Sequence, residues 1–383
     1  MLMLLALACA PDTSDPTNRT ARPGDDTGGD DTDVPAEGCR AAPAPADRDR
    51  VVLVALPYDA AANASDTWAV LTLTAEGALE DDGTRIEMGR LTIGEVAFTP
   101  DASLALAPTE DGRLAVYDAA NGVVVEAAWD GGFYAGRVVA DPSGEAAWVV
   151  DGNWQNNGGG LYRVELDCAT GAPSNAVRVL EAKLPADMLW VDGGALLVGR
   201  EVPGAAAGDD IARLDWPDTA QAPTLRDGAD AFGDDDAVVS DAAVAGGWAL
   251  IGDVSEFSGV PTRIARVRLD DPLDVAAPVD IEDPMSIVPF PDGSARALVA
   301  SGYGDALFVL DVEAGTTAQV DASRVQLPGA MVAVTRGPLD GLVLVSEVGG
   351  VRIVELGDGA SDGGVFAFGS GLDALPGAIG VAP

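Results

Sequence analysis

The chain has 383 residues and a formal net charge of −40, from 62 acidic and 22 basic side chains. A negative field of this size repels nucleic acid and anionic lipid. The chain contains no histidine, which excludes a Ser-His-Asp triad, a Cys-His pair and the commonest sets of transition-metal ligands.

An apolar run from Met1 to Ala8 precedes Cys9. This run is too short to cross a bilayer, which takes about 20 apolar residues. With the small Ala8 before Cys9, it resembles the end of a bacterial lipoprotein signal peptide, although no Lys or Arg precedes it. The resemblance implies that residues 1–9 are a signal, that Cys9 is acylated, and that the protein is lipid-anchored in the bacterial cell envelope, outside the cytoplasm. The alternative is an incidental apolar N-terminus.

Residues 10–46 are rich in Pro, Asp, Thr and Gly. Such a segment has too little apolar surface to offset the entropy of ordering it, so we predict a disordered acidic tether. Paired Asp residues occur between Asp25 and Asp33, but they lack the ligand spacing of a calcium loop. We therefore expect no metal site here.

Residues 47–383 contain a unit that recurs about every 40 to 55 residues. An apolar strand is followed by a Pro/Asp/Gly turn, a second apolar strand, a loop and a third strand that ends in Asp. The unit is clearest over residues 96–122 and returns over residues 287–315. Self-similarity of this length indicates a repeat architecture, and four strands per unit are typical of a β-propeller blade.

The turn between the first two strands of each unit marks the repeats. Gly tolerates positive φ and Pro presets the first turn position, so these residues suit tight hairpins. Six such turns predict six complete units. They lie at Pro100-Asp101, Asp141-Pro142-Ser143-Gly144, Asp192-Gly193-Gly194, Ala245-Gly246-Gly247, Pro291-Asp292-Gly293 and Pro338-Leu339-Asp340-Gly341.

A seventh unit is split between the two ends of this region. Residues 51–56 and 68–73 behave like a second and a third strand, and the missing first strand is found in residues 377–382. The chain is therefore predicted to be an all-β, seven-bladed β-propeller, closed by pairing of the C-terminal strand with the first blade. Six or eight blades remain possible if the weak repeats of blades four and five are misread. Two β-sandwiches are the alternative fold.

Residues 112–124 and the Pro291-Asp292-Gly293 turn resemble the YVTN-type β-propeller repeat. The similarity extends over blades two, three, six and seven and fades in blades four and five. The motif implies a fold and no particular chemistry.

Cys39 and Cys168 are an even pair in a presumed oxidising compartment. Cys39 lies just before the first blade, and Cys168 follows the third strand of blade three. In propellers both positions lie on the same rim, so we expect a disulfide between them. Two free thiols are the alternative.

The loops joining second and third strands, and the passages between blades, should gather around one mouth of the axial channel. They carry scarce aromatic and amide side chains, which suit a carbohydrate or peptide platform. The alternative is that these side chains merely pin long loops to the ring. The expected ligand-binding residues are Phe133, Tyr134, Trp154, Gln155, Asn156, Asp234, Asp235, Phe257, Tyr303 and Glu347.

These features predict a monomeric, non-catalytic binding or scaffolding module without a cofactor or resident metal. Its partner is an unspecified envelope protein or glycan, and no nucleic acid. The acidity is explained either by solubility in a saline habitat, which we favour, or by a polycationic or metal-ion partner. The first alternative function is a lactonase-like hydrolase that uses carboxylates and Arg in the channel. The second is a structural envelope component without a ligand.

Overall fold

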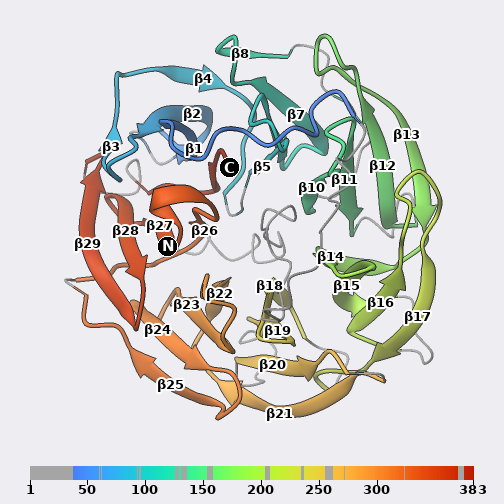
Figure 1. Ribbon diagram of the computed structural model, residues 1–383. Helices are drawn as coiled ribbons and strands as arrows, with labels where there is room; N and C mark the ends of the chain where they lie inside the picture. The colour runs from blue at the N-terminus through green and yellow to red at the C-terminus, as the bar shows by residue number, and fades with distance from the viewer. Residues whose placement is uncertain are drawn as a thin grey trace, which may run out of the picture.

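The computed structural model describes residues 38–383, apart from 60, 62, 93, 95, 126–128, 131–135, 153–157, 203–207, 234–236, 255–261, 271, 323 and 370–374. The strands form seven antiparallel sheets that surround one axis as blades (Figure 1). The protein is therefore an all-β, seven-bladed β-propeller, as the repeats predict.

Blade 1 contains β1 (Arg50–Tyr58), β2 (Ala64–Leu73), β3 (Leu79–Glu80), β4 (Arg85–Glu87) and β30 (Ile379–Val381). Blade 2 contains β5 (Ala97–Phe98), β6 (Leu104–Pro108), β7 (Arg113–Asp118), β8 (Val123–Val124) and β9 (Trp129–Asp130). Blade 3 contains β10 (Val138–Ala140), β11 (Ala146–Asp151), β12 (Gly160–Leu166) and β13 (Pro173–Leu180). Blade 4 contains β14 (Leu184–Val191), β15 (Gly194–Glu201), β16 (Ile211–Asp215) and β17 (Thr224–Ala229).

Blade 5 contains β18 (Val239–Ala245), β19 (Trp248–Asp253), β20 (Arg263–Arg268) and β21 (Asp274–Asp280). Blade 6 contains β22 (Pro284–Pro289), β23 (Arg296–Ser301), β24 (Ala306–Asp311) and β25 (Thr316–Gln319). Blade 7 contains β26 (Met331–Ala333), the 3₁₀ helix η2 (Gly337–Leu339), β27 (Leu342–Glu347), β28 (Gly350–Leu356) and β29 (Ala360–Ala367). Blades 4 and 5, whose repeats are weakest in sequence, are complete four-stranded sheets. None of the helices in the described chain has the length and apolarity that crossing a bilayer requires.

The C-terminal strand closes the ring. β30 pairs antiparallel with β1, so that Val381 lies opposite Val52 and Ile379 opposite Val54. The backbone of Ile379 also accepts a hydrogen bond from the N–H of Val96, at the entry to blade 2. Gly380 is required at this junction, because a Cβ there would lie 2.5 Å from the Cβ of Val96. The split unit predicted from the sequence is therefore confirmed.

Strand burial falls from the axis to the circumference. Every residue of β11 and of the inner strand β18 is buried, whereas every residue of the outer strand β25 is exposed. Strands between two neighbouring sheets are covered on both faces, which explains their continuous apolar runs.

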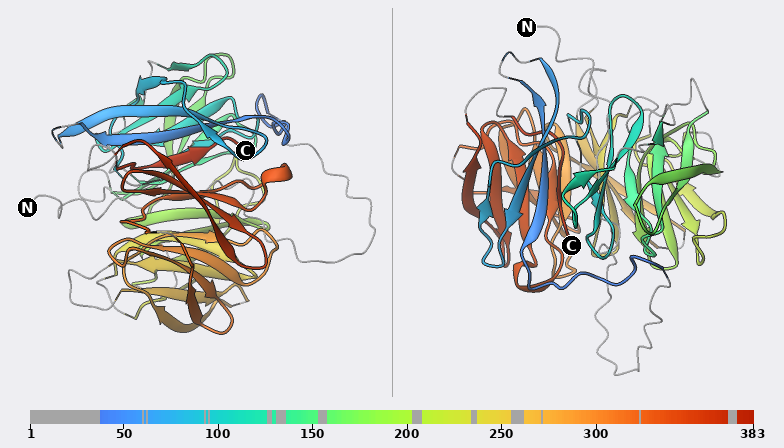
Figure 2. Two further views of the ribbon diagram at one scale, coloured as in Figure 1. Left: turned by 90° about the vertical axis from the view of Figure 1, so that its left-hand side faces the viewer. Right: turned by 90° about the horizontal axis from the view of Figure 1, so that it is seen from above.

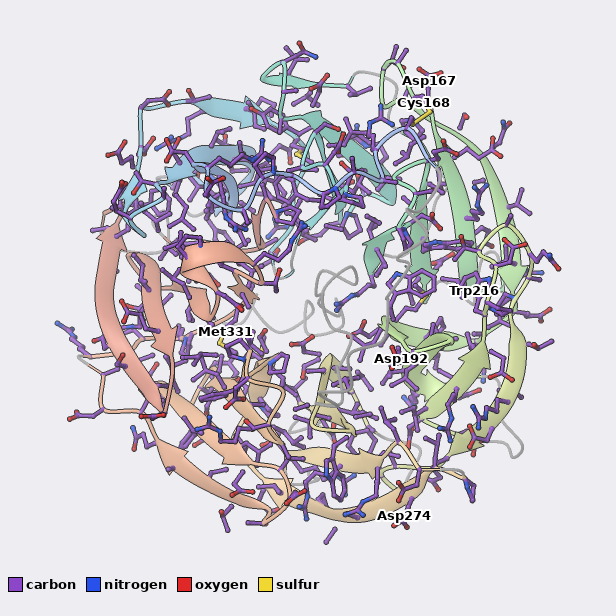
Figure 3. The ribbon with its side chains drawn as sticks, viewed as in Figure 1. Asp167, Cys168, Asp192, Trp216, Asp274 and Met331 are labelled. Carbon is purple, nitrogen blue, oxygen red and sulfur yellow. A yellow bond between two sulfur atoms is a disulfide. The ribbon has the colours of Figure 1, made fainter. Side chains whose placement is uncertain are left out.

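The hydrophobic core lies between the blades. The described residues form seven apolar clusters, each at the junction of two neighbouring blades. Between blades 3 and 4, Trp216 packs against Trp148 and Trp190, with ring centroids 4.4 and 5.2 Å apart (Figure 3). These rings fill the space between two twisted sheets.

A buried polar chain links the inner strands of blades 3 to 7. Arg137 Nη1 lies 2.9 Å from Asp187 Oδ2 and 3.7 Å from Asp241 Oδ1, and all three side chains are fully buried. Asp241 Oδ2 in turn accepts a hydrogen bond from the hydroxyl of Ser286, 3.0 Å away. Ser286 Oγ accepts one from the N–H of Met331 in blade 7. We call these residues the inner polar belt.

The segment before blade 1 crosses the face that carries the turns between first and second strands, which we call the turn face (Figure 2). Cys39 is disulfide-bonded to Cys168, at the rim of blade 3 (Figure 3). The Arg40 guanidinium donates to the carbonyls of Asp167 and Cys168, at 3.0 and 2.8 Å. Farther along, the N–H of Ala44 donates to the carbonyl of Pro100 in blade 2. Residues 38–46, the end of the predicted tether, are thus held by contacts that their composition does not reveal.

Candidate functional site

The opposite face, which we call the loop face, carries two kinds of connection. One is the loop between the second and third strands of a blade, which we call the 2–3 loop, and the other is the segment that crosses from one blade to the next. Here the second strands of four blades end in a buried polar residue that lies opposite the first residue of the third strand. These positions are occupied by Asp151, Asp253, Ser301 and Glu347. The fold therefore places a set of polar groups from different blades on one face, and their partners decide what they can do.

Asp253 contacts both the segment that enters blade 5 from blade 4 and the start of β20. Its Oδ1 accepts a hydrogen bond from the N–H of Val238, 3.0 Å away, and its Oδ2 lies 3.2 Å from Arg263 Nε. The Arg263 guanidinium also lies over the ring of Phe232, 5.1 Å from its centroid. The carboxylate thereby holds the end of the crossing from blade 4, while Arg263 holds its beginning.

Glu347 forms a buried ion-pair network within blade 7. Its two oxygens lie 2.8 and 2.9 Å from Nε and Nη2 of Arg352, and Arg352 Nη1 lies 2.7 Å from Asp362 Oδ1. Burial raises the pKa of Glu347 above its ordinary value, and the hydrogen bonds from Arg352 oppose this shift. Because Glu347 is only 3 % exposed, its carboxylate is shielded from solvent and interacts with Arg352 instead.

Asp210 is a buried acid of the loop face. It is fully buried before β16, and its Oδ2 accepts hydrogen bonds from the N–H groups of Ala231 and Phe232, at 2.8 and 3.0 Å. Among the described residues no N–H group donates to its Oδ1, and the carboxyl of Asp230 interacts with it. Burial raises the pKa of Asp210 to about 7, against the lowering effect of the two N–H groups.

We expect Asp210→Asn to be more stable than the wild type above pH 7. The folded-state pKa, about 7, exceeds the ordinary value of 3.8, so wild-type stability falls as pH rises through 7. Asn keeps an oxygen for the two N–H groups and adds an amide that can donate to Asp230. Urea midpoints measured from about pH 4 to 9 should be closest at the acid end, separate as the pH rises from about 4 to about 7, and differ by a constant amount above that. The exposed Asp274→Asn is the control, and equal effects of both variants would contradict the assignment (Figure 3).

The structure describes two of the residues predicted to bind a ligand. Tyr303 lies in the 2–3 loop of blade 6 with 56 % of its surface exposed, and Glu347 lies at the same face but is buried. The others lie outside the described residues, namely Phe133, Tyr134, Trp154, Gln155, Asn156, Asp234, Asp235 and Phe257. Sequence reasoning did not select Asp210, Asp253, Arg263 or Leu327. A polar residue that ends an apolar second strand is the signal that points to Asp253.

Within the described chain, sulfur and carboxylate ligand atoms gather at Cys39, Glu145 and Cys168. Both sulfur atoms belong to the disulfide, so neither is a thiolate able to bind a metal ion. The Glu145 carboxylate instead accepts a hydrogen bond from the N–H of Cys39. This group therefore holds the N-terminal segment to the rim of blade 3 through a disulfide and a hydrogen bond.

No family model and no curated protein sequence matches this chain. Solved structures share its fold. A putative 6-phosphogluconolactonase from Bacteroides fragilis is 11 % identical with a TM-score of 0.58, over 87 % of this chain and 98 % of the other. A functionally unknown protein from Desulfotomaculum acetoxidans is 13 % identical with a TM-score of 0.54, over the same shares of the two chains. AztD from Citrobacter koseri, in its apo form, is 11 % identical with a TM-score of 0.52, over 87 % and 97 %. At these identities the likeness shows the propeller fold alone.

Proposed function

We propose that this protein is an extracytoplasmic β-propeller, anchored to a membrane through a lipid on Cys9, that acts as a non-catalytic binding or scaffolding module. The disulfide between Cys39 and Cys168 is the observation that carries the proposal. Structural disulfides persist in oxidising compartments and are rare in the cytosol. The bond also fixes the end of the predicted tether to the rim of blade 3.

The attachment point gives the anchored protein an orientation. The disulfide and Arg40 hold the N-terminal segment on the turn face, so a lipid at Cys9 directs that face toward the membrane. The loop face, with Tyr303, then points away from the membrane, toward an envelope protein or glycan. The YVTN-type repeat belongs to the same proposal. The Pro291-Asp292-Gly293 turn that resembles it joins the first and second strands of blade 6.

Binding is a better fit than catalysis because the loop-face carboxylates have structural partners. Asp253 is paired with Arg263, and Glu347 is paired with Arg352. An arginine committed to a buried carboxylate is less able to stabilise charge on a reacting substrate. The chain also has no histidine to serve as a general base near neutral pH.

The anchor is tested by Cys9→Ala in cells of a bacterium that makes lipoproteins. The wild type is expected in the membrane fraction, with an acyl group on Cys9 by mass spectrometry, and the variant is expected to be unacylated and released from the membrane. A Cys168→Ser variant is the control, because it removes a cysteine and leaves Cys9 in place. Membrane retention of Cys9→Ala, or a mature chain without an acyl group, would overturn the anchor.

A carboxylate-based hydrolase is the second candidate, and Asp210 favours it. A carboxyl group with a pKa of about 7 is suited to general acid or base catalysis near neutral pH. Complete burial of its side chain argues for a structural role instead. Hydrolysis of a simple sugar lactone that is lost in Asp210→Asn, while the variant remains folded, would favour the hydrolase over the binding module.

A further inference from the structure

We propose that Tyr303 and Leu327 form a docking surface on the loop face for a basic segment of a protein partner. The segment would place an apolar side chain against these two residues and its positive charges beside the neighbouring carboxylates. This inference rests on the proposed binding function and names the site and the class of partner.

Tyr303 and Leu327 differ in position from the other exposed large apolar residues of the described chain. They are 56 % and 37 % exposed, and they lie in the 2–3 loop of blade 6 and in the crossing from blade 6 to blade 7. The remaining exposed members lie on the outer strands β8, β13, β17, β21 and β29, scattered over separate blades. These are Val123, Val177, Leu225, Val275 and Val365.

Two carboxylates hold the exposed pair in place. Asp283 Oδ2 accepts a hydrogen bond from the N–H of Tyr303, 3.0 Å away, and Asp305 Oδ1 accepts one from the N–H of Leu327, 2.7 Å away. Since Asp305 is only two residues from Tyr303, the second bond places the backbone of Leu327 beside the loop that carries Tyr303. The carbonyl of Gln326 then accepts a hydrogen bond from the N–H of Val348, which joins this surface to blade 7.

The backbone beneath this surface is strained. Six described residues other than glycine have positive φ, and four of them lie here: Asp283, Asp305, Arg324 and Leu327, with φ between 42° and 49°. Positive φ is unfavourable for L-residues, and for a leucine it is an outlier. Strain of this kind is retained where the surrounding contacts impose it, and it is concentrated at binding sites. A surface that is rigid before binding loses less conformational entropy on association.

The charge around the pair favours a basic partner. Glu282 and Asp305 are exposed, and the Glu282 carboxylate lies 3.6 Å from the position that a Cβ on Gly304 would occupy. Arg324 is an exposed base in the same crossing, but the protein as a whole carries a net charge of −40. A field of this sign attracts cationic segments and speeds their association. Tyrosine is enriched at the centre of protein interfaces, where a neighbouring aliphatic residue adds apolar area.

The test measures binding of a synthetic peptide in which Arg and Leu alternate, by fluorescence anisotropy in 0.15 M salt (about 8 Å Debye length). The variant Tyr303→Ser/Leu327→Asn removes the apolar pair, with Asn chosen because it tolerates positive φ. The matched control Val177→Ser/Leu225→Ser removes two exposed apolar residues from outer strands. Both variants keep the net charge, and thermal melts establish that both fold.

We expect the loop-face variant to weaken binding about tenfold or more and the control to change it less than about twofold. A peptide with Glu in place of Arg should not bind. Equal losses in both variants, or no binding by the wild type, would overturn the proposal, because the attraction would then be non-specific or absent. A neutral chito-oligosaccharide that binds the wild type and not the loop-face variant would assign the surface to a glycan instead. If the peptide fails while the Cys9-anchored protein still captures a partner in the envelope, this inference fails and the proposed function stands.

Discussion

Deletion of residues 377–383 should prevent the protein from folding to a stable ring. This segment supplies β30, the inner strand of blade 1, and its backbone bonds to β1 on one side and to the entry of blade 2 on the other. Without it, β1 loses its inner partner strand, and the apolar cluster between blades 1 and 2 is exposed to water. An unpaired strand edge also invites aggregation. The loss should exceed that of a single core truncation, roughly 5 kcal/mol, which is comparable with the whole stability of many domains.

A point variant distinguishes the loss of ring closure from the effect of shortening the chain. Ile379 is fully buried in the cluster between blades 1 and 7, so Ile379→Ala should lower the free energy of unfolding by about 2 to 5 kcal/mol. Val365→Ala on the exposed outer strand β29 is the matched control and should cost well under 1 kcal/mol. Urea denaturation followed by circular dichroism measures both. A truncated chain that melts cooperatively near the wild-type temperature would show that the ring does not depend on this strand.

The second large effect is expected at the inner polar belt. Arg137→Met retains much of the side-chain volume but removes the guanidinium that lies beside the buried carboxylates of Asp187 and Asp241. Removal of one partner from a buried ion pair typically costs about 3 to 5 kcal/mol, because the remaining charge is neither solvated nor neutralised. We therefore expect a fall of this size in the free energy of unfolding, measured by urea titration at pH 7.

Arg113→Met is the control for this prediction. Arg113 is paired with Asp111 at 2.6 Å, but both side chains are about half exposed, and exposed ion pairs contribute about 0 to 1 kcal/mol. Addition of Asp187→Asn to Arg137→Met should recover part of the loss, since it removes one of the two carboxylates that lose the Arg137 guanidinium. Equal costs for Arg137→Met and Arg113→Met would show that the belt does not stabilise the packing of the blades.

The repeat pattern was sufficient to predict the ring because each blade is a local unit. Turn residues such as Pro291 and Gly293 and the apolar strands on either side of them act within about 20 residues of one another. The split unit was also predictable, because residues 51–56 and residues 377–382 each lack the strand that the other supplies. Even the blades with the weakest repeats, 4 and 5, fold regularly, since burial between two neighbouring sheets requires only apolar side chains of suitable size.

The candidate site depended on contacts between segments far apart in the chain. Tyr303 was selected from the sequence as a loop aromatic, but the backbone of Leu327 is held at the same loop by the carboxylate of Asp305. The raised pKa of Asp210 likewise arises from burial and from the nearby Asp230. The sequence alone does not show which of its 62 acidic residues has such surroundings.

By itself, then, the sequence determined the architecture, its closure and the position of the turns, because these follow from periodic hydrophobicity and local turn chemistry. The tertiary structure decided which charged groups are buried, which of them are paired and which apolar residues stay exposed on one face. Those properties depend on the distances between blades, and such distances are set by packing rather than by order along the chain.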